Sequence, residues 1–331
     1  FYPPDPSSVR VATLGGTVAE GAGGLSGAKY GTTKDYVLGL EVVLPTGEII
    51  RTGGKTVKDR AGFDLTHLIV GSEGTLGIIT EMTLRLIPLP EARQTCIAAF
   101  DSVEQAAETV MAIVRRGIVP MALELMDKES VHHAEAFRPA GLPLDAGAIL
   151  LIEVDGSEVD VPHQLQRVLD ACKEEGAREV RVAANDRERE LMWSARRAHY
   201  PALAQAAKTI IVEDVTVPRP VLAKAIRAIR EAAERHHVRI GLAAHAGDGN
   251  IHPDIMCDES DSEEMERVHR FFQDIMRAAI DLGGSISGEH GIGLLKKEFL
   301  PWQRGEAGVE AMRRIKRALD PNNILNPDKV F

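Results

Sequence analysis

The sequence predicts an α+β protein built from two domains. Its 331 residues, 44% of them apolar, exceed the roughly 250–300 residues at which a single hydrophobic core stops growing. Residues 1 to about 90 are rich in glycine and in short β-branched runs, whereas helical and strand patterns alternate beyond them. The prolines of "IPLP" separate the glycine-rich segment from the segment in which helical and strand patterns alternate. We therefore expect domains at 1–90 and 91–331.

Short strands joined by glycine-rich turns are expected in the first domain. The runs on either side of "PTG" in "YVLGLEVVLPTGEIIRTGG" predict a β-hairpin. "LTHLIVGSEGTLGIITEMTLRLIPLP" predicts a strand, a turn and a second strand. We interpret "LGGTVAEGAGG" (14–24) and "GSEGTLGIIT" (71–80) as strand-to-turn segments. Neither matches a dinucleotide-binding or P-loop motif, so by themselves they do not identify a cofactor.

Helices and strands alternate in the second domain. Apolar residues at helical spacing predict helices at 102–117, 160–176, 186–207 and 219–236. Strands are expected in "GAILLIEVDG", "REVRVA" and "TIIVEDVTVP". This order suggests a sheet with helices laid on one face.

The composition argues against several classes of protein. A net charge of −10 and a pI near 5.6 disfavour binding to nucleic acids or to an anionic membrane surface. The three cysteines have no C-x-x-C spacing, so neither a disulfide framework nor a thiolate metal cluster is suggested, and a cytoplasmic setting is expected. No apolar run approaches the ~20 residues of a transmembrane helix.

Two histidines flank the turn in "HAGDGNIH" (245–252). If Asp248 and Gly249 are the central residues of a type I′ turn, His245 and His252 become direct cross-strand neighbours. Their Cβ atoms would then lie about 4.5–5.5 Å apart, close enough for both imidazoles to bind one metal ion. The alternative is a pair of ordinary polar residues at the end of a hairpin.

A second glycine-rich stretch, "GGSISGEHGIGLLKKEF", carries Glu289 and His290. Its small residues allow close approach to a bulky ligand. Two histidines plus one carboxylate, with open coordination positions, are typical of a catalytic divalent-metal site. His290 would then be available as an acid or base. The alternative is a loop with a surface Glu-His pair.

Seven segments together resemble the FAD-linked D-2-hydroxy acid dehydrogenases, which belong to the vanillyl-alcohol oxidase superfamily and are typified by the large flavin subunit of glycolate oxidase. They are "FYPPDPSS", "GGTVAEGAGG", "KYGTTKDYVLGLEVVLPTGE", "GSEGTLGIITEMTLRLIPLP", "HAGDGNIHP", "SGEHGIGLLKKEFL" and "ALDPNNILNPDKVF". The resemblance covers essentially the whole chain. It implies the rear part of a PCMH-type FAD-binding domain followed by a cap domain with an antiparallel sheet covered by helices.

The resemblance also implies roles for individual residues. His245, His252 and Glu289 match metal ligands, with zinc expected and manganese or iron as alternatives. His290 matches the histidine that handles the substrate hydroxyl proton, and Arg196 matches an arginine that holds the substrate carboxylate. From the pattern alone, Arg196 would lie on a solvated helix face. The residues that match the FAD-binding segments are Gly15, Gly16, Thr17, Ala19, Gly23, Gly24, Tyr30, Gly31, Gly71, Glu73, Gly74, Gly77, Ile78 and Ile79.

The sequence also departs from the family pattern. The family's upstream P-R-G-x-G-T type loop is missing, so we expect a fragment that lacks the front half of the flavin domain. Asp254 stands where relatives commonly have asparagine, and Val212 and Glu213 stand in a strand where D-2-hydroxyglutarate enzymes carry a lysine. These differences favour a small monocarboxylate substrate such as glycolate or D-lactate.

The expected reaction is hydride transfer from a D-2-hydroxy acid to FAD. The expected electron acceptor is a protein or a quinone, with an iron–sulfur subunit as one candidate. Such a partner could hold the protein against the inner face of the membrane. Two alternatives remain open: a metal-dependent hydrolase using the His-His-Glu site, and a non-catalytic flavin-binding subunit of a larger complex.

Overall fold

The structure is a computed structural model that describes residues 1–331, and the chain forms two compact units. The first unit combines Phe1–Leu89 with Ile286–Phe331, and the second is Pro90–Ser285. The change of unit after Leu89 falls at the proline pair. The segment 286–331, which the sequence analysis assigns to the second domain, packs with the first unit.

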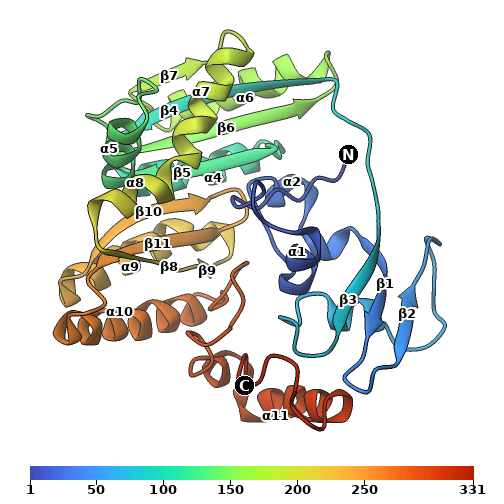
Figure 1. Cartoon of the computed structure of the whole chain (residues 1–331). Helices are drawn as coiled ribbons and strands as arrows, with labels where there is room; N and C mark the ends of the chain where they lie inside the picture. Colours follow the sequence, from blue (N-terminus) through green and yellow to red (C-terminus); the bar gives the residue numbers. More distant parts are fainter. The chain divides into compact units, whose positions relative to one another are not determined.

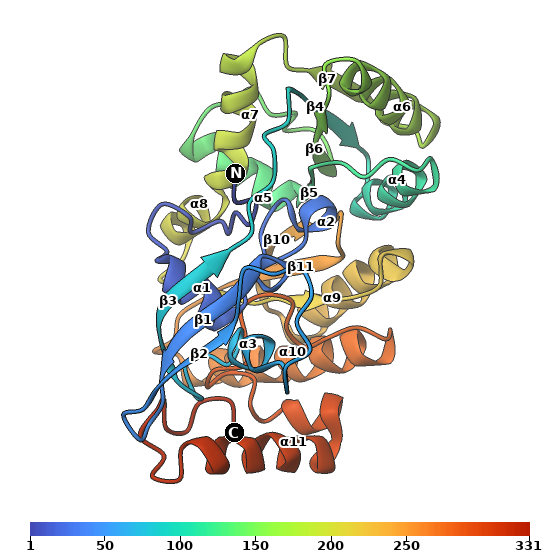
Figure 2. The same ribbon diagram turned by 90° about the vertical axis from the view of Figure 1, so that its right-hand side faces the viewer.

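A three-stranded antiparallel sheet organises the first unit, with β1 between β2 and β3 (Figure 2). The unit contains α1 (Leu14–Glu20), α2 (Gly27–Tyr30), η1 (Thr33–Asp35), β1 (Val37–Val43), β2 (Ile49–Gly53), α3 (Leu65–Ile69), β3 (Ile78–Leu84) and α11 (Leu300–Leu319). The hairpin predicted around "PTG" is confirmed, because Val43 of β1 pairs with Ile49 of β2. Val18 of α1, Leu40 and Val42 of β1 share its buried core.

Two predicted strand segments of this unit are helices. Leu65–Ile69 forms α3 because the side chain of Asp64 accepts a hydrogen bond from the backbone of His67 and caps the first turn. Leu14–Glu20 forms α1, with Thr13 as the N-cap and Gly21 as a left-handed C-cap at φ 70°. The glycine-rich "LGGTVAE" is therefore a short capped helix, and the strand-to-turn interpretation is wrong.

The second unit is built on an eight-stranded sheet in the order β7-β4-β6-β5-β10-β11-β8, with β9 also paired to β11 (Figure 1). Its strand pairs are antiparallel. The elements are β4 (Ala92–Phe100), α4 (Val103–Arg115), β5 (Ala122–Asp127), α5 (Lys128–Phe137), β6 (Ala148–Gly156), α6 (Asp160–Glu174), β7 (Glu179–Val182), α7 (Asp186–Arg197), α8 (His199–Ala206), β8 (Thr209–Val212), β9 (Val215–Thr216), η2 (Arg219–Val221), α9 (Leu222–His236), β10 (Arg239–His245), β11 (Asn250–Cys257) and α10 (Ser262–Asp281).

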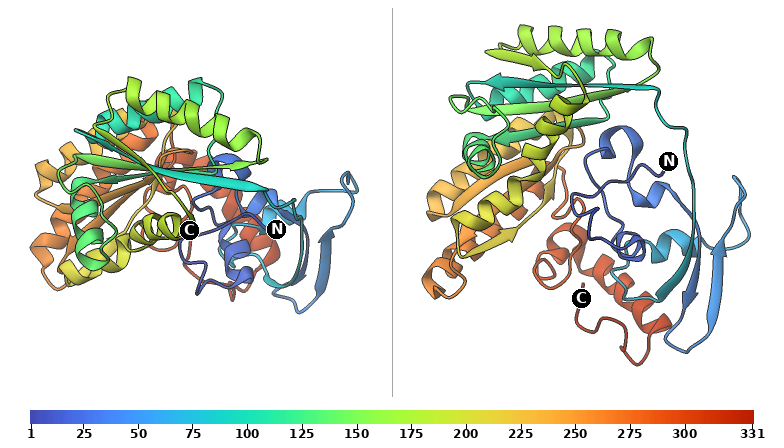
Figure 3. Two further views of the ribbon diagram at one scale, coloured as in Figure 1. Left: turned by 90° about the horizontal axis from the view of Figure 1, so that it is seen from above. Right: turned by 45° about the horizontal axis from the view of Figure 1, so that its top comes forward.

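Helices cover both faces of this sheet, so the prediction of a single covered face is wrong. Helices α4, α6, α9 and α10 contact one another along one face, while α5, α7 and α8 pack together on the other (Figure 3). The fold class itself, α+β with a helix-covered antiparallel sheet, is confirmed.

The long helix predicted at 186–207 is two helices that meet at Ala198. Pro201 has no N–H to bond the carbonyl of Arg197, which ends the first helix there. The strand predicted in "TIIVEDVTVP" is likewise two short strands, β8 and β9. Of the helices in this structure, none combines the length and the apolar character needed to cross a lipid bilayer.

Candidate metal and substrate site

The two histidines of "HAGDGNIH" lie on the β10–β11 hairpin, but their register differs from the prediction. His245 pairs with Asn250, and His252 pairs with Ala243. The loop has four residues, 246–249, in which Gly249 has a positive φ of 87° and Asp248 does not. A type I′ turn requires positive φ at both central residues, so the two-residue turn is wrong. The histidines are diagonal neighbours, and the even offset keeps both on one face of the sheet.

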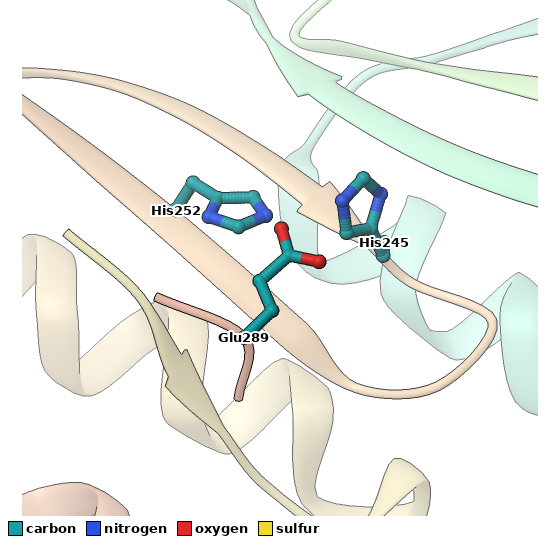
Figure 4. Close-up of side chains that lie close together, drawn as sticks. All are labelled: His245, His252 and Glu289. Carbon is teal, nitrogen blue, oxygen red and sulfur yellow. The ribbon is translucent and has the colours of Figure 1, made fainter. Parts of the chain in front are cut away.

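The two imidazoles come together on that face. Their ring centroids lie 4.9 Å apart in an edge-to-face arrangement, and Figure 4 shows the two rings side by side on the hairpin. Only 2% of His245 and 6% of His252 is exposed. Buried histidines this close can offer two nitrogen ligands to one ion.

Each imidazole is oriented through its Nδ1 atom. Nδ1 of His245 donates to the carboxylate of Glu124, at 2.8 and 2.9 Å from its two oxygens. Nδ1 of His252 lies 3.3 Å from the backbone carbonyl oxygen of Glu213. Metal-binding histidines usually donate one ring N–H to a carboxylate or carbonyl in this way, which directs the other nitrogen at the ion. The arrangement therefore fits a pair of Nε2 ligands.

Glu124 of β5 is the centre of a buried charge cluster that the sequence analysis missed. Glu124 is fully buried and pairs in register with His245. Burial acts to raise the pKa of Glu124, but the charges and hydrogen bonds of His245 and Arg196 outweigh it, so the pKa lies below its usual value. The available signal was a single carboxylate inside the apolar run "MALELM".

Arg196 lies at the end of α7 and is only 7% exposed. The interpretation of this residue as part of a solvated helix face is therefore wrong. Its Nε donates to Oε2 of Glu124 at 2.9 Å. That bond uses one of the five N–H donors of the guanidinium and fixes the plane of the fork.

A second buried pair lies on the same face of the hairpin. Asp254 follows His252 by two residues on β11, so both side chains point to one face. Oδ2 of Asp254 lies 2.5 Å from Nε2 of His199, which begins α8. Asp254 is 2% exposed and His199 4% exposed. Asp254 stands out in the sequence as a departure from the family pattern, whereas His199 does not, because no sequence pattern links residues 55 positions apart.

Glu289 and His290 belong to the first unit. Nε2 of His290 lies 3.7 Å from Oε1 of Glu289, and their side chains are 35% and 13% exposed. Glu289, also labelled in Figure 4, packs against the segment after α1. A Cβ added at Gly23 would lie 2.7 Å from its Oε2. Glycine at position 23 is therefore needed for this carboxylate to occupy its place.

The two glycine-rich segments predicted to bind FAD lie side by side in the first unit. The backbone N–H of Gly71 donates to the backbone carbonyl of Val18 at 3.1 Å, and the backbone N–H of Glu73 donates to the backbone carbonyl of Ala19 at 2.9 Å. The predicted residues are placed as follows: Gly15, Gly16, Thr17 and Ala19 on α1, Gly23 and Gly24 after it, Tyr30 and Gly31 at the end of α2, Gly71, Glu73, Gly74 and Gly77 in the loop before β3, and Ile78 and Ile79 at its start.

Comparison with known protein families identifies the class as a flavin-linked oxidase. Residues 89–330 match the family described as FAD linked oxidases, C-terminal domain, and residues 1–53 match an FAD binding domain. The chain belongs to the FAD-linked oxidase family and is an FAD-dependent oxidoreductase. The resemblance to the D-2-hydroxy acid dehydrogenases is confirmed by these domains together with the relatives described next, and the hydrolase interpretation is disfavoured.

Its relatives share sequence over the whole chain. It is 46% identical to "Glycolate oxidase subunit GlcD" of Bacillus subtilis, over 100% of this chain and 70% of that protein. It is 40% identical to GlcD of Escherichia coli, over 99% of this chain and 66% of that protein. It is 38% identical to "D-lactate dehydrogenase" of Anaerostipes hadrus, over 100% of this chain and 71% of that protein. The chain therefore spans about two thirds of the length of these relatives.

A solved structure of p-cresol methylhydroxylase shares the fold. It has a TM-score of 0.76 at 17% sequence identity, over 96% of this chain and 68% of that one. At this identity the likeness concerns the fold alone.

Proposed function

We propose that this protein oxidises a small D-2-hydroxy acid, glycolate or D-lactate, to the corresponding 2-oxo acid. The relatives named glycolate oxidase subunit and D-lactate dehydrogenase support this substrate class. The observation that carries the proposal is the buried constellation of His245, His252 and Arg196, with Glu124 holding both His245 and Arg196. FAD supplies the hydride acceptor when bound, and the segments around α1 and the loop before β3 would hold it.

A divalent metal ion is part of the proposal, with zinc expected and manganese or iron as alternatives. His245, His252 and Glu289 are its candidate ligands. Two imidazoles with oriented Nδ1 atoms and one carboxylate match the donor set of a catalytic site with open positions. Such an ion, when bound, lowers the pKa of a hydroxyl group that it contacts.

The remaining steps belong to side chains of this chain. Arg196 binds the substrate carboxylate through the N–H groups that its bond to Glu124 does not use. The imidazole of His290 accepts the hydroxyl proton as the hydride leaves. The fixed fork of Arg196 orients the substrate before the reaction, which reduces the entropic cost of reaching the reactive geometry.

A monocarboxylate is the proposed substrate because acidic groups lie near the arginine and the histidines. Asp254 of β11 and Glu213, which directly follows β8, are both nearly fully buried. A second carboxylate on the substrate would meet these charges in a low-dielectric setting, where repulsion is strong. D-2-hydroxyglutarate is accordingly expected to be a poor substrate.

The reduced flavin is proposed to pass its electrons to a partner protein or a quinone, with an iron–sulfur subunit as one candidate. The name "subunit" carried by two relatives supports a partner. A cytoplasmic location, at the inner face of the membrane through such a partner, completes the proposal.

Flavin bleaching in the full-length protein tests this function. We expect glycolate or D-lactate to reduce the bound flavin under anaerobic conditions, and L-lactate and D-2-hydroxyglutarate to leave it oxidised. His290→Ala should retain flavin but lose reduction, whereas the exposed control His132→Ala should behave as wild type. Wild-type reduction rates in His290→Ala would overturn the role of that imidazole.

Elemental analysis tests the metal independently. The wild-type protein and His132→Ala should contain about one divalent ion per chain, and His245→Ala and His252→Ala should lose it, since each variant removes one of three ligands. A wild-type protein without a divalent ion, and with activity unaffected by chelators, would overturn the metal assignment.

A further inference from the structure

Glu73 connects several segments of the first unit that are far apart in the sequence. It lies in the loop before β3 and has a left-handed backbone with φ 53°. Its backbone N–H donates to Ala19 of α1 at 2.9 Å, and its backbone carbonyl accepts from Nδ2 of Asn326 at 2.6 Å. A residue other than glycine adopts this conformation at an energetic cost, so its surroundings must hold it there.

The carboxylate of Glu73 binds the loop that carries Glu289 and His290. Oε1 accepts from the backbone N–H of Ile292 at 2.7 Å, and Oε2 accepts from that of Gly293 at 2.7 Å. Each oxygen thus bonds one of two consecutive amides. Hydrogen bonds to an ionised acceptor are about twice as strong as neutral ones.

The loop has a shape that accommodates this carboxylate. Gly291 has φ 77°, and a Cβ at this position would lie 2.8 Å from Oε1 of Glu73 and 2.1 Å from Oε1 of Glu20. Only glycine allows the backbone to come so close. The turn that follows His290 is therefore shaped around the carboxylates of Glu73 and Glu20.

We infer that Glu73 is a positioning residue that holds the Glu289–His290 loop in place, and that its side chain is not a ligand of the flavin. This inference rests on the proposed function, because the loop matters to the reaction only if Glu289 and His290 act in it. In the described contacts, Glu73 touches the side chain of neither Glu289 nor His290. It acts through the backbone of Ile292, two residues after His290.

Hydrogen exchange of the full-length, flavin-loaded enzyme tests the inference without relying on activity. In Glu73→Ala, the peptide that contains Ile292 and Gly293 should exchange more than about tenfold faster, since a hydrogen bond to a charged group contributes at least that factor. Glu73→Gln keeps the shape and one neutral acceptor oxygen, so its exchange should be intermediate. Glu81→Gln, a control at a 63% exposed carboxylate on β3, should match wild type.

Turnover measurements complete the test. We expect kcat to fall about tenfold or more in Glu73→Ala, with a smaller change in KM and an unchanged flavin content. Unchanged exchange at Ile292 and Gly293, or unchanged kcat despite faster exchange, would overturn the inference. Loss of flavin without faster exchange would overturn it too, and would make Glu73 a cofactor ligand. Should Glu73→Ala fail to fold, the same exchange and turnover comparisons are made with Glu73→Gln.

The test also separates this inference from the proposed function. A wild-type enzyme that oxidises no 2-hydroxy acid would refute the proposed function, while the exchange result would still decide whether Glu73 holds the loop.

Discussion

Replacing Glu124 should destabilise the second unit more than any change on its surface. In Glu124→Ala the guanidinium of Arg196, which is 7% exposed, and the imidazole of His245 lose the anion between them. Breaking a buried ion pair by removing one partner costs about 3–5 kcal/mol. Glu124→Gln keeps a neutral acceptor and should cost about 1–3 kcal/mol.

Thermal unfolding followed by circular dichroism measures this effect. For a unit of this size each kcal/mol lowers Tm by about 2–4 °C, so Glu124→Ala should unfold about 6–20 °C below wild type. Glu179→Gln, at an exposed position on β7 of the same sheet, is the matched control and should stay within about 2 °C. If Glu124→Ala unfolded at the wild-type temperature, the buried cluster would not hold the strands and α7 together as described.

Three further outcomes are expected. Trp193→Phe removes the indole donor that lies 2.7 Å from the buried carboxylate of Glu153; it should cost about 1–3 kcal/mol in urea unfolding, and an unchanged midpoint would contradict the bond. Lys316→Met leaves the buried carboxylate of Asp320 without its cation and should cost about 3–5 kcal/mol, measured in the same way. Burial acts to raise the pKa of Asp320, but the bond from Lys316 and two backbone amides outweigh it and leave the pKa below its usual value. The stabilisation is therefore present above the pKa that Asp320 has in the unfolded chain and is lost as the pH falls through its lower folded-state pKa; urea midpoints that stayed constant as the pH was lowered into this acidic range would refute this sign.

Local patterns predicted much of the fold and part of the site. The hairpin at "PTG", the helices α4 and α6 and the strand β6 follow from spacing and turn residues within short windows. The prediction that His245 and His252 share a face holds despite the wrong turn, because an even shift in register preserves the side of the strand. Periodicity therefore placed the two imidazoles together.

What depends on distant neighbours could not be read from such windows. No local pattern predicted the strand β5 or a role for Glu124, whose partners Arg196 and His245 are 72 and 121 residues away. The charged sequence around Arg196 is typical of a solvated helix, and only the paired carboxylate explains its burial. α3 formed in place of a strand because one side chain, Asp64, caps it.

The discontinuous first unit has a consequence for how the protein is made. Residues 1–89 leave the ribosome well before residues 286–331, yet the two segments form one unit. For example, Nζ of Lys316 donates a hydrogen bond of 2.9 Å to the backbone carbonyl of Thr75, although the two residues are 241 positions apart in the sequence. Forming contacts between residues this far apart in the sequence has a large cost in loop-closure entropy, unless the intervening chain has already become compact. The continuous second unit can do so first, as a domain that folds during synthesis. On this order of events, the His290 loop takes shape last, when the returning segment 286–331 docks.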